Sequence, residues 1–251
     1  MNLPNLPPAE TIALFLDFDG TLVEIAEHPD AVKLDIATKT ALAILASRLG
    51  NAVAIITGRE IEVIDRMIAP LQLPVAGIHG LQRRNSSDDF PSARNTTADF
   101  VDILKARLAP LVEREAGLIL EVKACSVALH YRARPELQQI CLEACEDAIA
   151  DLTDIELKRG KMVLEAKPDT ANKGTAILDY MSEPPFLGRT PWFAGDDVTD
   201  EDAFDVVNRL GGVSIKVGPG ETVATHSAES TAGFLNWLIE GADNLRLEGK
   251  V

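Results

Sequence analysis

The sequence predicts an α/β fold, a Rossmann-like parallel sheet interrupted by a smaller inserted α+β domain. Short apolar runs alternate with segments of helical spacing between residues 12 and 80, and this alternation resumes near residue 169. Between these two stretches the order changes to helix–strand–strand–helix–strand–strand. We therefore expect a core of residues 1–82 and 169–251 and an inserted domain of residues 83–168.

The elements of the core follow from the positions of the apolar residues. Apolar runs at 12–16, 52–56 and 75–78 predict strands, and helical spacing at 36–49 and 61–68 predicts the helices between them. This order favours parallel strands joined by right-handed crossovers. The elements expected after the insert are a helix opening at 172–174, a strand at 192–194, a helix at 204–210, a strand at 213–217 and a helix at 234–239.

The insert is expected to contain two helices and two hairpins, after a polar connection or hairpin over residues 82–95. The expected positions are 97–115 and 135–150 for the helices, and 118–122, 127–131, 155–157 and 162–164 for the strands. Cys141 and Cys145 lie four residues apart on the second helix. We expect both to pack in the core, because no nearby histidine or cysteine completes a metal site.

Length and composition exclude several classes of protein. The 251 residues suffice for two modest domains, and a net charge of −15 without a basic cluster argues against nucleic acid as a partner. The sequence contains no run of eighteen apolar residues, so we expect no membrane span. The first residues lack the pattern of a secretory signal. Three cysteines do not suit a disulfide framework. We expect a cytoplasmic protein, and a monomer.

Two carboxylates follow the first apolar run directly. Asp17 and Asp19 are two residues apart, so an extended chain presents both side chains on the same side, and Gly20 allows a turn after them. An Asp-Gly pair after a strand is often only a turn. A calcium loop does not fit, since Leu22 and His28 occupy the positions where such a loop needs glycine and glutamate.

Later strand ends and a helix start supply matching polar groups. Because the carboxyl ends of parallel strands meet along one edge of a sheet, these groups are expected to converge there. Crowded carboxylates raise one another's pKa, and a divalent cation relieves this; oxygen ligands without clustered His or Cys favour magnesium. Lys173 and Arg59 add positive charge for an anionic substrate. The later groups are Thr57, Lys173, Asp196, Asp197 and Asp200.

Taken together, these motifs resemble the four-part signature of the haloacid-dehalogenase superfamily. More narrowly, the chain is similar to trehalose-6-phosphate phosphatases over nearly its whole length, with no departure at a catalytic position. The superfamily motifs are Asp17-Phe18-Asp19-Gly20-Thr21, Thr57-Gly58-Arg59, Lys173, and Gly195-Asp196-Asp197 with Asp200. The stretches that match the narrower family are 16–22, 56–59, 77–80, 128–132, 163–168, 172–174 and 195–201.

The resemblance implies a role for each core residue. Asp17 would be the nucleophile that forms an aspartyl-phosphate, and Asp19 the general acid and base. Side chains of Asp17 and Asp196 and the backbone carbonyl of Asp19 would bind Mg²⁺. The remaining implied roles are phosphate binding by Thr57 and Lys173, loop shaping by Gly20 and Thr21, support of the metal ligands by Asp200, and a bond from Asp197 to Lys173 or to a loop amide.

The resemblance also implies the substrate, trehalose 6-phosphate, and an insert that acts as a cap over the sugar. Residues expected to contact substrate are Gly20, Arg59, Glu121, Lys123, His130 and Glu165. For the cap residues, simple solvation of a charged side chain is an equally good reading. Two alternatives stay open: another sugar phosphate, of sucrose or mannosylglycerate type, and a non-catalytic phosphosugar-binding protein. A dinucleotide enzyme is disfavoured, since no Gly-x-Gly-x-x-Gly turn follows the first strand.

Overall fold

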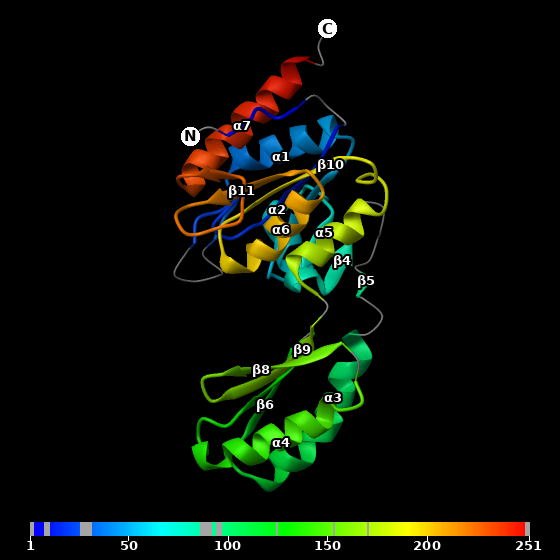
Figure 1. Ribbon diagram of the computed structural model, residues 1–251, viewed down its shortest axis with the longest axis vertical. Helices are drawn as coiled ribbons and strands as arrows, with labels where there is room; N and C mark the ends of the chain where they lie inside the picture. The colour runs from blue at the N-terminus through cyan, green and yellow to red at the C-terminus, as the bar shows by residue number, and fades with distance from the viewer. Residues whose placement is uncertain are drawn as a thin grey trace. The chain divides into compact units, whose positions relative to one another are not determined.

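A computed structural model describes residues 3–7, 11–25, 32–85, 92–93, 97–123, 125–152, 154–169 and 171–248. The chain divides into two compact units (Figure 1). The first unit combines Met1–Pro91 with Asn172–Val251, and the second is Ser92–Ala171. The sequence placed these boundaries after residues 82 and 168, whereas the two units of the structure meet after residues 91 and 171.

The first unit is built on a large sheet with the strand order β12-β11-β10-β1-β2-β3-β4-β5. The strands from β12 to β3 are parallel, and β4 is antiparallel to β3. The predicted parallel α/β sheet is therefore confirmed. Strand bounds are Ile12–Leu16 (β1), Val53–Ile56 (β2), Val75–Gly77 (β3), Gln82–Arg84 (β4), Ser92–Ala93 (β5), Thr190–Gly195 (β10), Val213–Val217 (β11) and His226–Ala228 (β12).

Both faces of β1 are buried, which explains why this strand is a continuous apolar run. Leu14 and Leu16 belong to one apolar cluster, together with residues of α1, α2 and α7. Ala13 and Phe15, which alternate with them, belong to the other cluster, with residues of α5 and α6. The helix bounds are Ile36–Arg48 (α1), Ile61–Ile68 (α2), Lys173–Met181 (α5), Glu201–Arg209 (α6) and Thr231–Glu248 (α7).

Two elements of the first unit differ from the sequence expectation. The helix expected at 234–239 runs over Thr231–Glu248, because Ala242 and Leu245 continue its buried face. The short strand β12 was not expected, since His226, Ser227 and Ala228 form no apolar run. Of the polar connection expected at 82–95, residues 86–91, 94 and 95 lie outside the described part of the chain.

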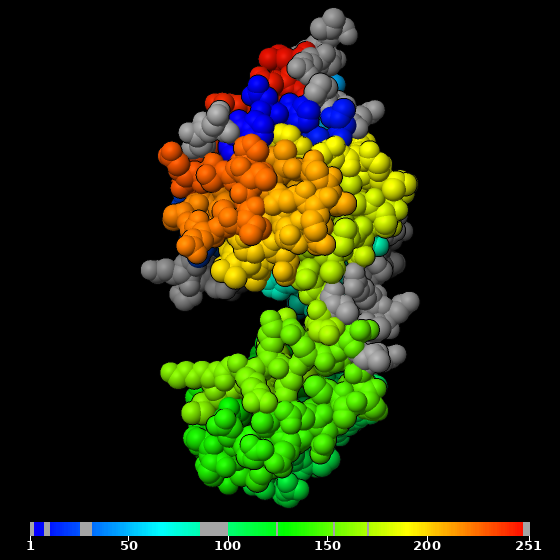
Figure 2. All heavy atoms as spheres, viewed as in Figure 1, coloured from blue at the N-terminus to red at the C-terminus, as the bar shows by residue number. Residues whose placement is uncertain are grey.

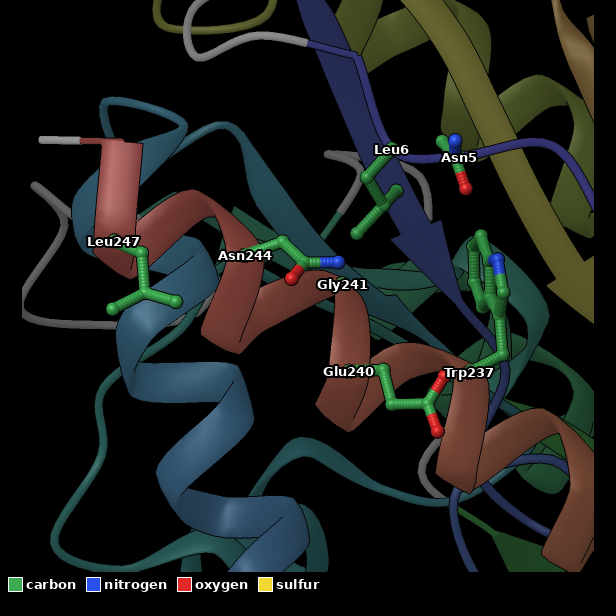
Figure 3. A pocket seen from close by; sticks show the side chains of 7 residues that line it. All are labelled: Asn5, Leu6, Trp237, Glu240, Gly241, Asn244 and Leu247. Carbon is green, nitrogen blue, oxygen red and sulfur yellow. The ribbon is translucent and has the colours of Figure 1, made fainter.

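Residues 3–7 pack against α7. The indole Nε1 of Trp237 donates to the carbonyl of Pro4 at 3.0 Å. Gly241 allows close packing here, because a Cβ at this position would lie 2.6 Å from Cδ1 of Leu6. A shallow pocket remains beside this contact, lined also by Asn5 and Asn244 (Figure 3).

The second unit is a four-stranded antiparallel sheet with the order β6-β7-β9-β8, packed on two helices. Its core contains Val127, Leu129 and Leu164 from the sheet, and Cys141 and Cys145 from the second helix. The predicted core role of these cysteines is thus confirmed. Element bounds are Thr97–Arg114 (α3), Ile119–Lys123 (β6), Ser126–His130 (β7), Gln138–Ile149 (α4), Ile155–Gly160 (β8) and Val163–Pro168 (β9), with a 3₁₀ turn at Pro135–Leu137.

Polar residues cover the sheet face opposite to this core. Because Val127 and Leu129 face the helices, the alternate residues of β7 face the other way. Glu121, Ala128 and Glu165 are register partners across three adjacent strands, so their side chains share this second face. None of the described helices in either unit combines the length and the hydropathy that a membrane span requires.

Candidate active site

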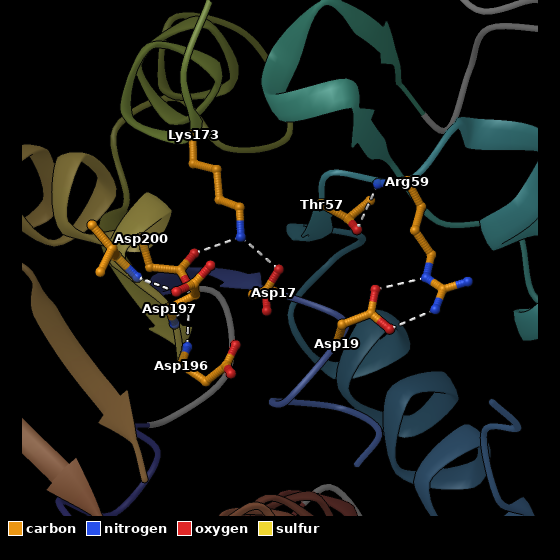
Figure 4. Close-up of polar contacts among 9 residues, drawn as sticks. Asp17, Asp19, Thr57, Arg59, Lys173, Asp196, Asp197 and Asp200 are labelled. Atoms are coloured by element: carbon orange, nitrogen blue, oxygen red, sulfur yellow. Dashed lines mark hydrogen bonds and ion pairs between the residues drawn. The ribbon is translucent and has the colours of Figure 1, made fainter. Parts of the chain in front are cut away.

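The carboxyl ends of β1 and β10 lie side by side in the first unit. The amide of Asp17 donates to the carbonyl of Ala194 at 2.9 Å, which extends the ladder by one residue. The acidic residues that follow the two strands therefore converge (Figure 4). In the space-filling view the residues of the C-terminal third, yellow to orange, form one continuous face of this unit (Figure 2).

Lys173 lies between two of the carboxylates. Its Nζ donates to Oδ1 of Asp17 at 2.7 Å and to Oδ1 of Asp200 at 2.6 Å. All three side chains are at most 5% exposed. Asn172 caps α5 by accepting from the amide of Thr175, so Lys173 is the first residue of the helix. The helix start thus aims the ammonium group at the acidic edge of the sheet.

Asp200 connects Lys173 to the loop after β10. Its Oδ2 accepts from the amides of Asp196 at 3.0 Å and Asp197 at 2.9 Å. Asp197 itself accepts from the amide of Val198 at 2.7 Å. Of the two partners expected for Asp197, the structure therefore shows a loop amide. The ammonium of Lys173 pairs with Asp17 and Asp200.

Burial changes the protonation of this cluster. Burial raises the pKa of Asp17 to about 8, although the Lys173 ammonium opposes the shift. Burial and the nearby Asp200 also raise the pKa of Asp196. For Lys173, burial acts against the charged form, but Asp17 and Asp200 outweigh it and raise its pKa. The site therefore holds more acidic groups than its own cation can keep ionised.

These carboxylates fit a hard divalent cation. Oxygen atoms of Asp17, Asp196 and Asp200 lie within 4.8 Å of one another, and all are the hard ligands that Mg²⁺ prefers. A second positive charge here would return the raised carboxyl groups to their ionised forms. The adjacent backbone leaves space only for glycine: Gly20 has φ +81°, and a Cβ would lie 2.0 Å from Oδ2 of Asp196.

Thr57 and Arg59 lie at the end of the neighbouring strand β2. Thr57 is 1% exposed, and its Oγ accepts from the amide of Arg59 at 3.2 Å. Arg59 pairs with Asp19 through two bonds, from Nε to Oδ2 at 2.6 Å and from Nη2 to Oδ1 at 2.7 Å. Figure 4 shows Asp19 turned toward Arg59, while Asp17 points toward Lys173.

Two contacts near the site were not foreseen from the sequence. Lys216 on β11 is 6% exposed, and its Nζ donates to the backbone carbonyl of Asp196. Thr231 at the start of α7 donates to the carbonyl of Gly20 at 2.6 Å. A lysine inside an apolar strand was a usable signal for Lys216, since a buried ammonium needs a partner. Thr231 carried no signal.

The substrate-contact candidates of the second unit form two groups on the polar sheet face. His130 Nε2 lies 2.8 Å from Oε2 of Glu121. Oε1 of Glu165 accepts from Lys123 Nζ at 3.0 Å and from Ser126 Oγ at 2.7 Å. Burial acts against ionisation of Glu165, but the bonds from Ser126 and Lys123 outweigh it and lower its pKa. Ser126 was not foreseen from the sequence, because it precedes an apolar run and looks like a turn residue.

Solved structures with the same fold define the class of protein. A haloacid-dehalogenase-like hydrolase from B. subtilis is 14% identical, with a TM-score of 0.56 over 90% of this chain and 98% of that one. At this identity the likeness shows the fold alone. A trehalose-6-phosphate phosphatase from Aspergillus fumigatus is 26% identical, with a TM-score of 0.73 over 94% of each chain. The chain therefore shares the fold of these hydrolases.

Sequence comparisons narrow the class to a family. Residues 15–233 match the trehalose-phosphatase family. A probable trehalose-phosphate phosphatase from Sinorhizobium fredii is 43% identical over 82% of this chain and 78% of its own length. The trehalose-6-phosphate phosphatase of Escherichia coli is 38% identical over 90% of this chain and 85% of its own length. The chain belongs to the trehalose-phosphatase family, a family of phosphoric monoester hydrolases.

Proposed function

We propose that this chain hydrolyses trehalose 6-phosphate to trehalose and phosphate, with Asp17 as nucleophile and Mg²⁺ as cofactor. The observation that carries the proposal is the buried contact of Lys173 with Asp17 and Asp200, beside the Asp196 carboxylate. A nucleophilic carboxylate and a phosphate ester are both anionic, so a phosphatase that uses one needs cations fixed at that point. Family membership and the names of the relatives supply the substrate.

The proposed reaction has two steps. In the first, an oxygen of Asp17 attacks phosphorus, the bond to the sugar oxygen breaks, and Asp19 gives its proton to that oxygen. In the second, Asp19 takes a proton from water, the water oxygen attacks phosphorus, and the Asp17 carboxylate leaves. Lys173 and Thr57 hold the phosphoryl oxygens in both steps.

Mg²⁺ would be held by the side chains of Asp17 and Asp196 and the carbonyl of Asp19. When bound, the ion neutralises charge on the carboxylates and on the phosphate. Asp200 supports this arrangement because it holds Lys173 with one oxygen and the Asp196 and Asp197 amides with the other. Lys216 donates to the backbone carbonyl of Asp196 in the same loop.

The second unit is proposed as the cap that recognises the disaccharide. A sugar offers many hydroxyl groups, and discrimination comes from paired donors and acceptors. Glu121, Lys123, His130 and Glu165 provide such groups on the exposed sheet face. The monomeric state and the cytoplasmic location remain predictions from the sequence.

The test is phosphate release from a panel of esters, with Mg²⁺ and after chelation by EDTA. The expected result is preference for trehalose 6-phosphate over sucrose 6-phosphate, mannosylglycerate phosphate and glucose 6-phosphate, loss of turnover with EDTA, and recovery on adding Mg²⁺. Asp17→Asn should lower kcat at least about a thousandfold while the circular dichroism spectrum is kept. A flat profile overturns the substrate, and metal-dependent binding without turnover of any ester favours a phosphosugar-binding protein.

A further inference from the structure

Arg59 forms a two-bond ion pair with Asp19. Both oxygens of the Asp19 carboxylate and two nitrogens of the guanidinium take part, at 2.6 and 2.7 Å. Such a paired fork fixes the plane of the carboxylate as well as its position. In the described part of the chain, Arg59 is the one side chain that pairs with Asp19.

The two catalytic carboxylates differ in how much they need this support. The side chain of Asp17 is 5% exposed and is held by Lys173. The side chain of Asp19 is 38% exposed, so water and rotation about its own bonds compete with any single orientation. A general acid and base must transfer its proton at a fixed point, so the rate of the reaction falls when its carboxylate can rotate freely.

Arg59 is itself held on several sides, so it can act as a fixed support. Its amide donates to Thr57 Oγ at 3.2 Å, and its carbonyl accepts from the amide of Ile78 at 3.0 Å. Its guanidinium carbon lies 6.0 Å from the centre of the Phe18 ring. Ile78 has φ +48°, a strained conformation for a β-branched residue that the surrounding structure maintains.

We propose that Arg59 is a positioning residue that acts on the reaction through the Asp19 carboxylate, and that it is not a contact to the sugar phosphate. This proposal rests on the proposed function, in which Asp19 transfers the protons. It replaces the substrate-contact role that the sequence suggested for Arg59, because two of its three guanidinium nitrogens, Nε and Nη2, are engaged by Asp19.

The chain contains a closely matched control. Arg84 and Asp65 also form a two-bond ion pair, through Nη1 and Nη2 at 2.6 and 2.7 Å. Its side-chain exposures are 14% and 37%, against 16% and 38% for Arg59 and Asp19, and Nη2 of Arg84 also donates to the carbonyl of Leu73 at 3.2 Å. Arg84 lies on β4, outside the proposed catalytic set. Arg59→Ala and Arg84→Ala therefore each remove a two-bond ion pair of similar length and exposure, and only the first should change the chemistry.

The experiment is a double-mutant cycle between Arg59 and Asp19, read as kcat and KM. Arg59→Ala is expected to lower kcat about ten- to a hundredfold with KM changed less than about twofold. In the Asp19→Asn background, measured in single turnover at high enzyme concentration, Arg59→Ala should change the rate less than about twofold. Arg59→Lys should recover only part of kcat, because an ammonium cannot form the fork.

A second readout does not depend on turnover. The ¹⁵N resonance of the Arg59 Nε–H group should shift in Asp19→Asn and stay unchanged in Asp65→Asn. Three results would overturn the proposal: a raised KM with kcat retained in Arg59→Ala, additive losses in the cycle, or an equal loss of kcat in Arg84→Ala. If trehalose 6-phosphate is not the substrate, the cycle is run with the ester that the wild type hydrolyses fastest, so the two failures are separable.

Discussion

The two units each contain a lysine bound to carboxylates, in opposite environments. In the first unit, Lys173 and its partners Asp17 and Asp200 are at most 5% exposed. In the second, the Lys123 and Glu165 side chains are 46% and 31% exposed. Buried charges are held in one arrangement because each would be costly without the other. Exposed charges exchange partners with water at little cost, which suits them to recognise hydroxyl groups.

The largest expected difference follows from removing each lysine. Lys173→Ala leaves two buried carboxylates without their cation, so it should lower the free energy of unfolding by about 3–5 kcal/mol and abolish turnover. Lys123→Ala should lower the free energy of unfolding by less than about 1 kcal/mol. Urea unfolding of both variants measures the difference. Similar free energies of unfolding for the two variants would contradict the difference between the buried and the exposed lysine.

A smaller effect is expected on substrate binding. Glu165→Gln should raise KM for trehalose 6-phosphate about tenfold and leave kcat within about twofold, since the proposed cap would contribute binding rather than chemistry. The control is Glu146→Gln, which breaks the exposed pair of α4 with Arg159 at 3.1 Å. Steady-state kinetics of both variants checks this. A fall in kcat with unchanged KM would assign Glu165 to the reaction itself.

The smallest expected effect is the pH dependence of stability in the second unit. The pKa of Glu165 is lowered in the folded state from its ordinary value of 4.5, so its stabilising contribution is present above that value and is lost as the pH falls through the folded pKa. Ser126→Ala removes one of the bonds that lower it. The stability advantage of the wild type over this variant should be constant near neutral pH and shrink in acid. An advantage that grows in acid would contradict the assignment.

Periodicity was enough to predict most of the fold. In β1, α1 and α2 the buried positions recur at the spacing of a strand or a helix. The apolar residues of the sequence therefore show the same spacing. The three-residue strand β12 exists because β11 offers it an edge, with Ile215 opposite His226. Its own residues carry no pattern, so only the folded sheet reveals it.

The sequence predicted which residues form the site better than it predicted the contacts between them. Strand and helix ends in the sequence predict the site residues Asp17, Asp196, Asp200 and Lys173, and the structure brings them together. The fork between Arg59 and Asp19 joins residues forty positions apart across two loops, and no spacing encodes it. The same holds for Ser126 and Glu165, whose contact depends on the register of β7 with β9.

The position of β1 has a consequence for synthesis on the ribosome. This central strand leaves the ribosome early, but one of its two neighbours, β10, lies on the far side of the insert. Until β10 is translated, the nascent chain has an open edge at a fully apolar strand and lacks Lys173, Asp196 and Asp200. Fragments that stop within the insert should therefore be inert and prone to aggregate, and a chaperone that shields this edge should raise the yield of the full chain.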